Sequence, residues 1–149
     1  MTSLQLGDHA PQFQAKDNLG NTISLSDYTG KKLVLFFYPK ASTPGCTSEA
    51  CDLRDHYQVF LAKGYDILGV SADSEKRQDN FAQKYELPFP LLADENHQVI
   101  NGFGVWGPKK FMGREYDGIH RTTFVIDENG IIENVISKVK TKDHASQLL

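Results

Sequence analysis

Apolar residues along this chain form two patterns, short continuous runs and repeats with helical spacing. The run Leu33–Tyr38 (LVLFFY) ends at Pro39 and is typical of a strand that is buried on both faces. After the loop KASTPG, apolar residues recur along one helix face until Gly64, which predicts a single helix over this stretch. The residues of this face are Ala50, Leu53, Tyr57, Phe60 and Leu61.

The other predicted elements follow from the same patterns and from turn residues. In chain order they are a hairpin turning at 17–21, a strand at 65–72, a helix capped by Asp73 or Ser74 and ending near Tyr85, a strand at 90–94, a short helix in HQVINGFGV, two strands at 121–127 and 130–137 joined by DENG, and a helix from about Lys142.

The order of these elements predicts an α/β fold. Buried strands that alternate with helices pair in parallel through right-handed crossovers, and the late hairpin adds antiparallel strands. We therefore expect a mixed central sheet with helices on both faces, as in a thioredoxin-like fold. The length of 149 residues fits a single domain, 1–149.

Charge and hydropathy narrow the function classes. The 16 basic and 19 acidic residues give a net charge of −3, which does not suggest a nucleic-acid partner. The longest apolar run is far shorter than the ~20 residues that cross a bilayer. The N-terminus lacks the basic and apolar regions of a secretory signal, so we expect a cytoplasmic protein without a membrane partner.

The segment PKASTPGCTSEAC (39–51) holds the two cysteines of the chain, Cys46 and Cys51. Four interpretations are open: a metal site, a dithiol exchange site, a buried apolar residue and a reactive thiol. The five histidines are scattered singly, so we predict neither a metal nor another cofactor. A dithiol exchange site favours a Cys-x-x-Cys motif, which this chain lacks. In a reducing compartment, chemical roles for cysteine are commoner than disulfide staples.

The position of Cys46 favours the reactive thiol. Thr43 offers a capping hydroxyl and Pro44 suits a first helical turn, so Cys46 is predicted to lie in that first turn. Free amide groups and the positive end of the helix dipole favour a thiolate there, and the thiolate is the nucleophilic form of cysteine.

The spacing of the two cysteines limits how they can react with each other. Two residues five apart in an ideal helix differ in direction by roughly 140°, and their Cα atoms lie about 8–9 Å apart. A disulfide needs roughly 4.4–6.8 Å. A disulfide between Cys46 and Cys51 would therefore require the first turns to unwind, which disfavours a permanent staple.

The segment FYPKASTPGCTSEACDLRD closely resembles the active site of peroxiredoxins of the bacterioferritin comigratory protein class, also called peroxiredoxin Q. The family pattern Pro-x-x-x-Thr-x-x-Cys is present as Pro39, Thr43 and Cys46, and Cys51 matches the resolving cysteine of one branch. The likeness extends over nearly the whole chain, through GDHAPQF, GVSADS, LPFPLLAD and YDGIHRTTFVID.

This resemblance implies a thiol-dependent reduction of hydrogen peroxide and organic hydroperoxides. Cys46 would be oxidised to a sulfenic acid and form a disulfide with Cys51, which thioredoxin or a similar dithiol reopens. Thr43 would aim the peroxide, Pro39 would shield the thiolate, and Arg121, oriented by Glu49, would stabilise the reacting charges. The class is often monomeric. The alternatives are a redox sensor and a thiol-disulfide oxidoreductase.

Overall fold

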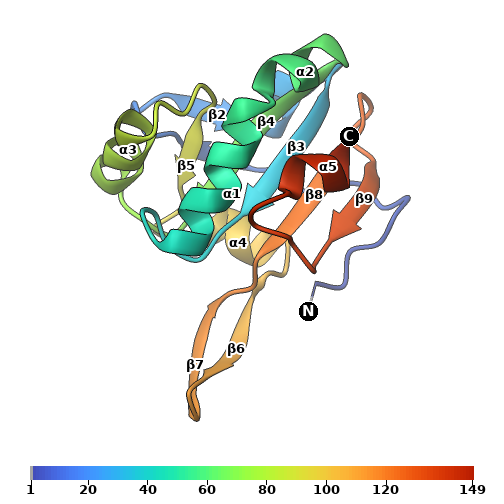
Figure 1. Cartoon of the computed structure of the whole chain (residues 1–149). Coiled ribbons are helices and arrows are strands. Elements are labelled where there is room, and N and C mark those ends of the chain that lie inside the picture. Colours follow the sequence, from blue (N-terminus) through green and yellow to red (C-terminus); the bar gives the residue numbers. More distant parts are fainter. Residues whose placement is uncertain (1) are drawn as a thin grey trace.

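The computed structural model describes residues 2–149, and a five-stranded mixed sheet forms its centre (Figure 1). The strand order is β5-β4-β3-β8-β9, in which β3 pairs in parallel with β4 and antiparallel with β8. The strands are β3 (Lys32–Phe37), β4 (Tyr65–Ser71), β5 (Leu91–Ala93), β8 (Thr122–Ile126) and β9 (Ile132–Ile136). This arrangement confirms the predicted mixed sheet of parallel strands and a late antiparallel hairpin.

An apolar cluster covers each face of the sheet, and β3 contributes to both clusters because its successive residues point to opposite sides. Val34 and Phe36 belong to one apolar cluster, whereas Leu33, Leu35 and Phe37 belong to the other. Since β3 lies in the middle of the sheet, its whole apolar run is buried. The continuous apolar run therefore forms a strand that is buried on both faces, as predicted.

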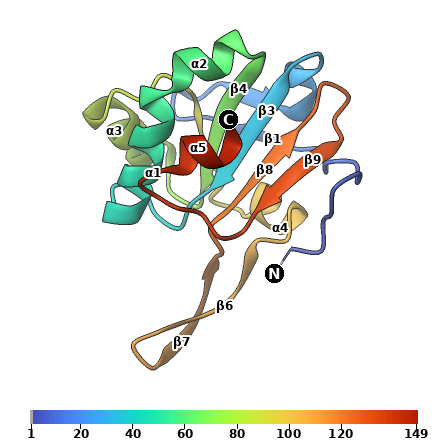
Figure 2. The ribbon, with the colours of Figure 1, turned by 45° about the vertical axis from the view of Figure 1, so that its right-hand side comes forward.

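Helices lie on both of these faces (Figures 1 and 2). The cluster that contains Cys46 takes residues from α1 (Pro44–Asp55), α2 (Tyr57–Ala62), α3 (Glu75–Lys84) and α5 (His144–Leu148). The other cluster takes residues from the 3-10 helix η1 (Leu25–Tyr28) and from α4 (Gln98–Gly102). A small sheet of β1 (Gln14–Lys16) and β2 (Thr22–Ser24) completes the N-terminal part. Of the two predicted caps, Ser74 begins α3 by accepting from the amide of Arg77.

Two features differ from the prediction. The long helix is interrupted at His56, which separates α1 from α2 and has backbone angles φ −108° and ψ 9°. The apolar spacing continues through this interruption, so the pattern does not reveal it. The second feature is an unpredicted hairpin of β6 (Trp106–Phe111) and β7 (Arg114–Ile119), which projects from the body of the protein (Figure 1).

Within residues 2–149, no helix combines the length and the apolar character needed to cross a membrane.

Candidate active site

Cys46 lies in the first turn of α1, beyond the carboxyl end of β3, as predicted. Pro44 is the first residue of the helix, and the first helical hydrogen bond joins the amide of Thr47 to the carbonyl of Thr43 at 2.8 Å. The amides of Gly45 and Cys46 precede this bond and contribute to the positive end of the helix dipole. Cys46 itself is only 1% exposed. A small substrate must therefore enter a nearly closed site to reach the sulfur.

Thr43 is at the predicted helix start, but its predicted capping hydrogen bond is wrong. The hydroxyl of Thr43 makes no bond to the helix and instead donates to the carbonyl of Lys40 at 2.8 Å. The intervening Ser42 has a φ of 65°, a left-handed conformation that turns the chain sharply there. Because its proton is engaged, the Thr43 oxygen is left as an acceptor.

Arg121 contacts both Cys46 and Glu49. It immediately precedes β8, and its Nη2 atom donates to the sulfur of Cys46 at 3.3 Å. Its Nη1 atom donates to Oε1 of Glu49 at 2.6 Å. Burial alone would lower the pKa of Arg121, but Cys46 and Glu49 raise it, and the net direction is upward. The guanidinium group thus stays charged beside the sulfur.

Gly45 makes room for this arginine. A Cβ atom at Gly45 would lie 3.2 Å from Nη2 of Arg121, which is a closer contact than side chains normally make. A larger residue would push the guanidinium group away from Cys46. The glycine before Cys46 therefore allows this close approach of Arg121.

Glu49 lies one turn after Cys46 and is fully buried. Burial raises the pKa of its carboxyl group to about 7, although the charge and hydrogen bond of Arg121 act in the opposite direction. Its second oxygen, Oε2, makes no hydrogen bond to the described residues. Nε2 of His144 lies 3.4 Å from that oxygen. The predicted pairing of Glu49 with Arg121 is present.

Cys51 is half-buried in the same helix, and both cysteines are free thiols in this structure. Burial raises the pKa of the Cys51 thiol, and Asp55 adds to this effect while Arg54 opposes it. Arg54, the other arginine of this helix, pairs with Asp55 and donates to the carbonyl of Tyr85. Arg54 is therefore engaged away from Cys46.

The loop before α1 is held by a residue whose role here the sequence analysis missed. Asp73 accepts from the amide of Ala41 at 2.8 Å and from the hydroxyl of Ser71 at 2.7 Å. Pro39 is half-buried in this loop, just after β3. The available signal was an acidic residue at the carboxyl end of a buried strand, which the sequence analysis interpreted only as a helix cap.

Lys109, on the unpredicted hairpin, adds a second cation near the site. Burial and the charge of Arg121 lower the pKa of Lys109, whereas Cys46 opposes this shift. The Nζ atom of Lys109 donates to the carbonyl of Ile119 at 2.9 Å, which holds the amine at the base of the hairpin. Within residues 2–149, no cluster of three or more His, Cys, Asp or Glu side chains is arranged to hold a metal ion.

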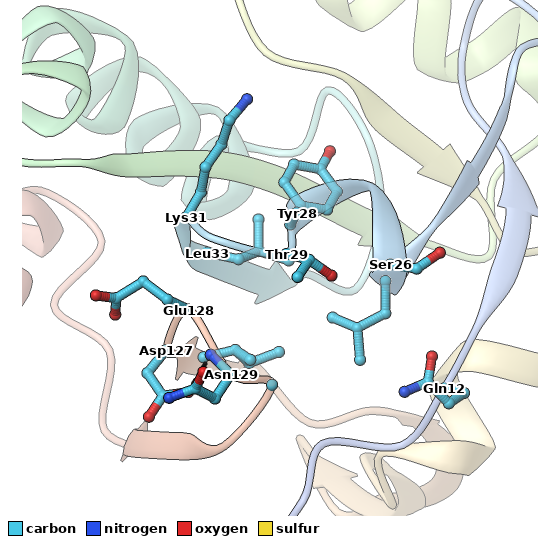
Figure 3. A pocket seen from close by; sticks show the side chains of 12 residues that line it. Gln12, Ser26, Tyr28, Thr29, Lys31, Leu33, Asp127, Glu128 and Asn129 are labelled. Atoms are coloured by element: carbon cyan, nitrogen blue, oxygen red, sulfur yellow. Dashed lines mark hydrogen bonds between the residues drawn. The ribbon is translucent and has the colours of Figure 1, made fainter.

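A cavity of about 280 Å³ lies away from Cys46 (Figure 3). Its walls include Lys31 and Leu33 at the start of β3, together with Asp127 and Glu128 after β8. Because β3 and β8 are antiparallel, these residues lie at the end of the sheet opposite to the one where Cys46 and Arg121 meet. The cavity is thus separate from Cys46.

Comparisons with known proteins identify the family of this chain. Residues 6–135 match the model of the AhpC/TSA family. The chain is 48% identical to peroxiredoxin Bcp of Escherichia coli, over all of this chain and 96% of the relative. It is 46% identical to peroxiredoxin Bcp of Bacillus subtilis, over 99% of this chain and 94% of the relative.

Solved structures give the same result. A mutant of peroxiredoxin Q from Xanthomonas campestris superimposes with a TM-score of 0.88 at 35% identity, over 99% of this chain and 94% of that one. A peroxiredoxin Q mutant from Xylella fastidiosa gives a TM-score of 0.93 at 31% identity, with the same coverage of 99% and 94%. The chain therefore belongs to the AhpC/TSA family, and within it to the thiol peroxidases of the Bcp or peroxiredoxin Q type.

Proposed function

We propose that Cys46 is the peroxidatic residue and reduces hydrogen peroxide and organic hydroperoxides. The observation that carries the proposal is the 3.3 Å contact between Nη2 of Arg121 and the sulfur of Cys46 at a helix N-terminus. The thiolate attacks the terminal oxygen of the peroxide, so an S–O bond forms and the O–O bond breaks. The released alkoxide or hydroxide takes up a proton, and Cys46 is left as a sulfenic acid.

The other residues of the motif orient this attack. The free acceptor oxygen of Thr43 receives the O–H of the peroxide, since its own proton is donated to Lys40. Arg121 stabilises the negative charge as it moves from sulfur to the leaving oxygen, and Glu49 fixes the plane of the guanidinium group. Pro39, in the loop that Asp73 holds, shields the sulfur from water.

Cys51 is proposed as the resolving residue. Its thiol attacks the sulfenic sulfur of Cys46, so a disulfide forms and water leaves. Both cysteines lie in α1, and an intact helix keeps residues at this spacing too far apart to bond. The N-terminal turns of α1 must therefore unwind in each cycle and refold after reduction.

An external dithiol returns the disulfide to two thiols, and we propose thioredoxin for this step. One of its thiolates forms a mixed disulfide with the enzyme, and its second thiol then releases the reduced enzyme. Organic hydroperoxides are included among the proposed substrates because a relative from Xanthomonas campestris, 34% identical, has structures that are described in terms of alkyl peroxide reduction. We further propose that residues 1–149 act as one domain, as a monomer and in the cytoplasm.

The test is a comparison of Cys46→Ser, Cys51→Ser and the wild type in peroxide consumption with thioredoxin, glutaredoxin and glutathione. We expect no turnover for Cys46→Ser, because a hydroxyl group has almost no anionic form at neutral pH. Retention of activity in that variant would exclude Cys46 as the nucleophile. A single turnover without recycling by any reductant would favour a redox sensor. Exchange with protein disulfides in the absence of peroxide would favour a thiol-disulfide oxidoreductase.

A further inference from the structure

One buried ionisable side chain that the proposed chemistry does not explain lies next to the site. His144, the first residue of α5, is fully buried and lies beside Glu49, although the two are far apart in sequence. Helix α5 packs next to α1 (Figure 2). A second contact joins the same two helices, since the amide of Ala145 donates to Oδ2 of Asp52 at 2.7 Å. His144 thus reaches the carboxylate that orients the catalytic arginine.

The hydrogen bonds of the ring fix where its proton lies. Nδ1 of His144 is 2.8 Å from Oε1 of Gln147. That oxygen also accepts from the amide of Lys140, and the side-chain nitrogen of Gln147 donates to the carbonyl of Lys138, so the orientation of this amide is defined. Because Oε1 only accepts, Nδ1 must carry a proton.

The other ring nitrogen faces two oxygens. Nε2 of His144 is 2.8 Å from the hydroxyl of Thr123 and 3.4 Å from Oε2 of Glu49. If the ring were neutral and Glu49 ionised, the lone pair of Nε2 would accept from the Thr123 hydroxyl, and Oε2 of Glu49 would be a buried anionic oxygen that has no hydrogen bond among the described residues. Such an arrangement is costly in a medium of low polarity. One additional proton, on either Oε2 or Nε2, removes the conflict.

We propose that His144 is a positioning residue of the peroxidase site, and that His144 and Glu49 together hold one proton while Cys46 is reduced. The proposal rests on the peroxidatic role of Cys46 given above. With this proton, the Glu49–His144 pair has no net charge, whichever partner holds the proton, so the positive charge of Arg121 balances the Cys46 thiolate. Without it, the cluster has one excess negative charge, and Arg121 is shared between two anions. The proton therefore reserves the charge of Arg121 for the sulfur.

Burial supports the same distribution of charge. It raises the pKa of Glu49 to about 7 and lowers the pKa of His144, so the proton favours the carboxyl group. The charged and ionisable groups around the pair are Arg121 before β8, Cys46 and Asp52 on α1, and Lys109 on β6, which lies near Arg121 and Cys46. Among these groups, it is the Glu49–His144 pair at which an added proton removes a buried negative charge next to Arg121.

The main experiment uses His144→Gln, in which a side-chain amide takes the place of Nε2. This amide donates to Oε2 of Glu49 but cannot hold the proton, so it stabilises the ionised carboxylate. We expect the pH midpoint for alkylation of Cys46 by iodoacetamide to rise by about one unit, which corresponds to roughly a tenfold smaller thiolate fraction below the midpoint. The rate of peroxide reduction at pH 6 should fall by a similar factor.

The double variant with Glu49→Gln separates this effect from a purely structural one. The side-chain amide that Glu49→Gln introduces is neutral at every pH and still offers an oxygen to Arg121. In the Glu49→Gln background, His144→Gln should leave the alkylation midpoint unmoved. An equal rise of the midpoint in both backgrounds would mean that His144 only supports α5, and would overturn the proposal.

A direct observation of the proton covers the case in which His144→Gln does not fold. At pH 6, the reduced wild type should show either the infrared carbonyl band of a protonated carboxyl group, absent in Glu49→Gln, or the ¹⁵N signals of a doubly protonated His144 ring. Absence of both would overturn the proposal. Neither alkylation nor spectroscopy requires peroxide turnover. A failure of the proposed peroxidase function would therefore be recognised separately: the wild type would not reduce peroxide, but the alkylation midpoints of the wild type and His144→Gln would still differ.

Discussion

Replacement of Arg121 by alanine removes the one side chain within residues 2–149 that donates to the sulfur of Cys46. Two unit charges 3.3 Å apart interact by about 1 kcal/mol at the dielectric constant of water, and by about 5 kcal/mol at the value of about 20 that suits sites near a protein surface. The Arg121 side chain is 22% exposed, so the effect should lie between these limits. We expect the second-order rate constant for peroxide to fall by roughly 10²–10³.

The assay is a stopped-flow measurement of peroxide consumption in the first turnover, when no reductant is present. Arg54→Ala is the matched control, because Arg54 lies in α1 but binds Asp55 and the carbonyl of Tyr85 instead of Cys46. This control should remain within about twofold of the wild type. Arg121→Lys should recover only part of the loss, since an amine does not present two parallel donors to Cys46 and Glu49.

Two results would refute this reasoning. A decrease of less than about threefold in Arg121→Ala would mean that another cation, such as Lys109, replaces the guanidinium group. An equal decrease in Arg54→Ala would mean that the charge of α1 as a whole matters more than the contact with sulfur.

Three further predictions concern Glu49 and the redox cycle. Because the pKa of Glu49 is raised from 4.5 to about 7, its contribution to stability is complete below pH 4.5 and is lost as the pH rises to about 7. The free energy of unfolding, measured in urea, should fall by about 3 kcal/mol over this pH range in the wild type but not in Glu49→Gln. The same pH dependence in both proteins would contradict this prediction. Cys51→Ser should consume one equivalent of peroxide at nearly the wild-type rate and stop at a sulfenic acid that mass spectrometry detects; a slow first turnover would argue against a purely resolving role. Hydrogen exchange in α1 should be faster in the disulfide form than in the reduced form, and equal protection would exclude unwinding.

The central sheet was predictable from the sequence because its strands are buried on both faces. A continuous apolar run such as Leu33–Tyr38, followed directly by Pro39, is typical of a strand in the middle of a sheet that is covered on both sides. The hairpin of β6 and β7 has no such apolar pattern. Its tip residues Phe111 and Met112 are exposed, and its strands pair with each other but with no strand of the central sheet, so no apolar alternation marks it.

The site was predictable only in part. The helix start around Cys46 could be predicted from a short segment, because the order of a threonine, a proline and a cysteine is recognisable there. The contacts of Arg121, Glu49 and His144 bring together three separate parts of the chain, and no local pattern encodes them. The hydroxyl of Thr43 was assigned wrongly because the left-handed Ser42, which directs it to Lys40, is not a residue type that predicts such a turn.

In the proposed cycle, helix α1 must meet two opposing requirements, and its composition meets both. Attack on peroxide needs the folded N-terminal turn, whereas disulfide formation needs that turn to open. The buried residues of the first turns are Cys46, Glu49 and Ala50, which are small or polar, so unwinding exposes little apolar surface. Leu53, farther along, is fully buried in the same cluster as Phe60 of α2 and resists exposure. The helix should therefore open from Pro44 as far as Cys51 and remain anchored at Leu53, so the increase in hydrogen exchange should end between these two positions.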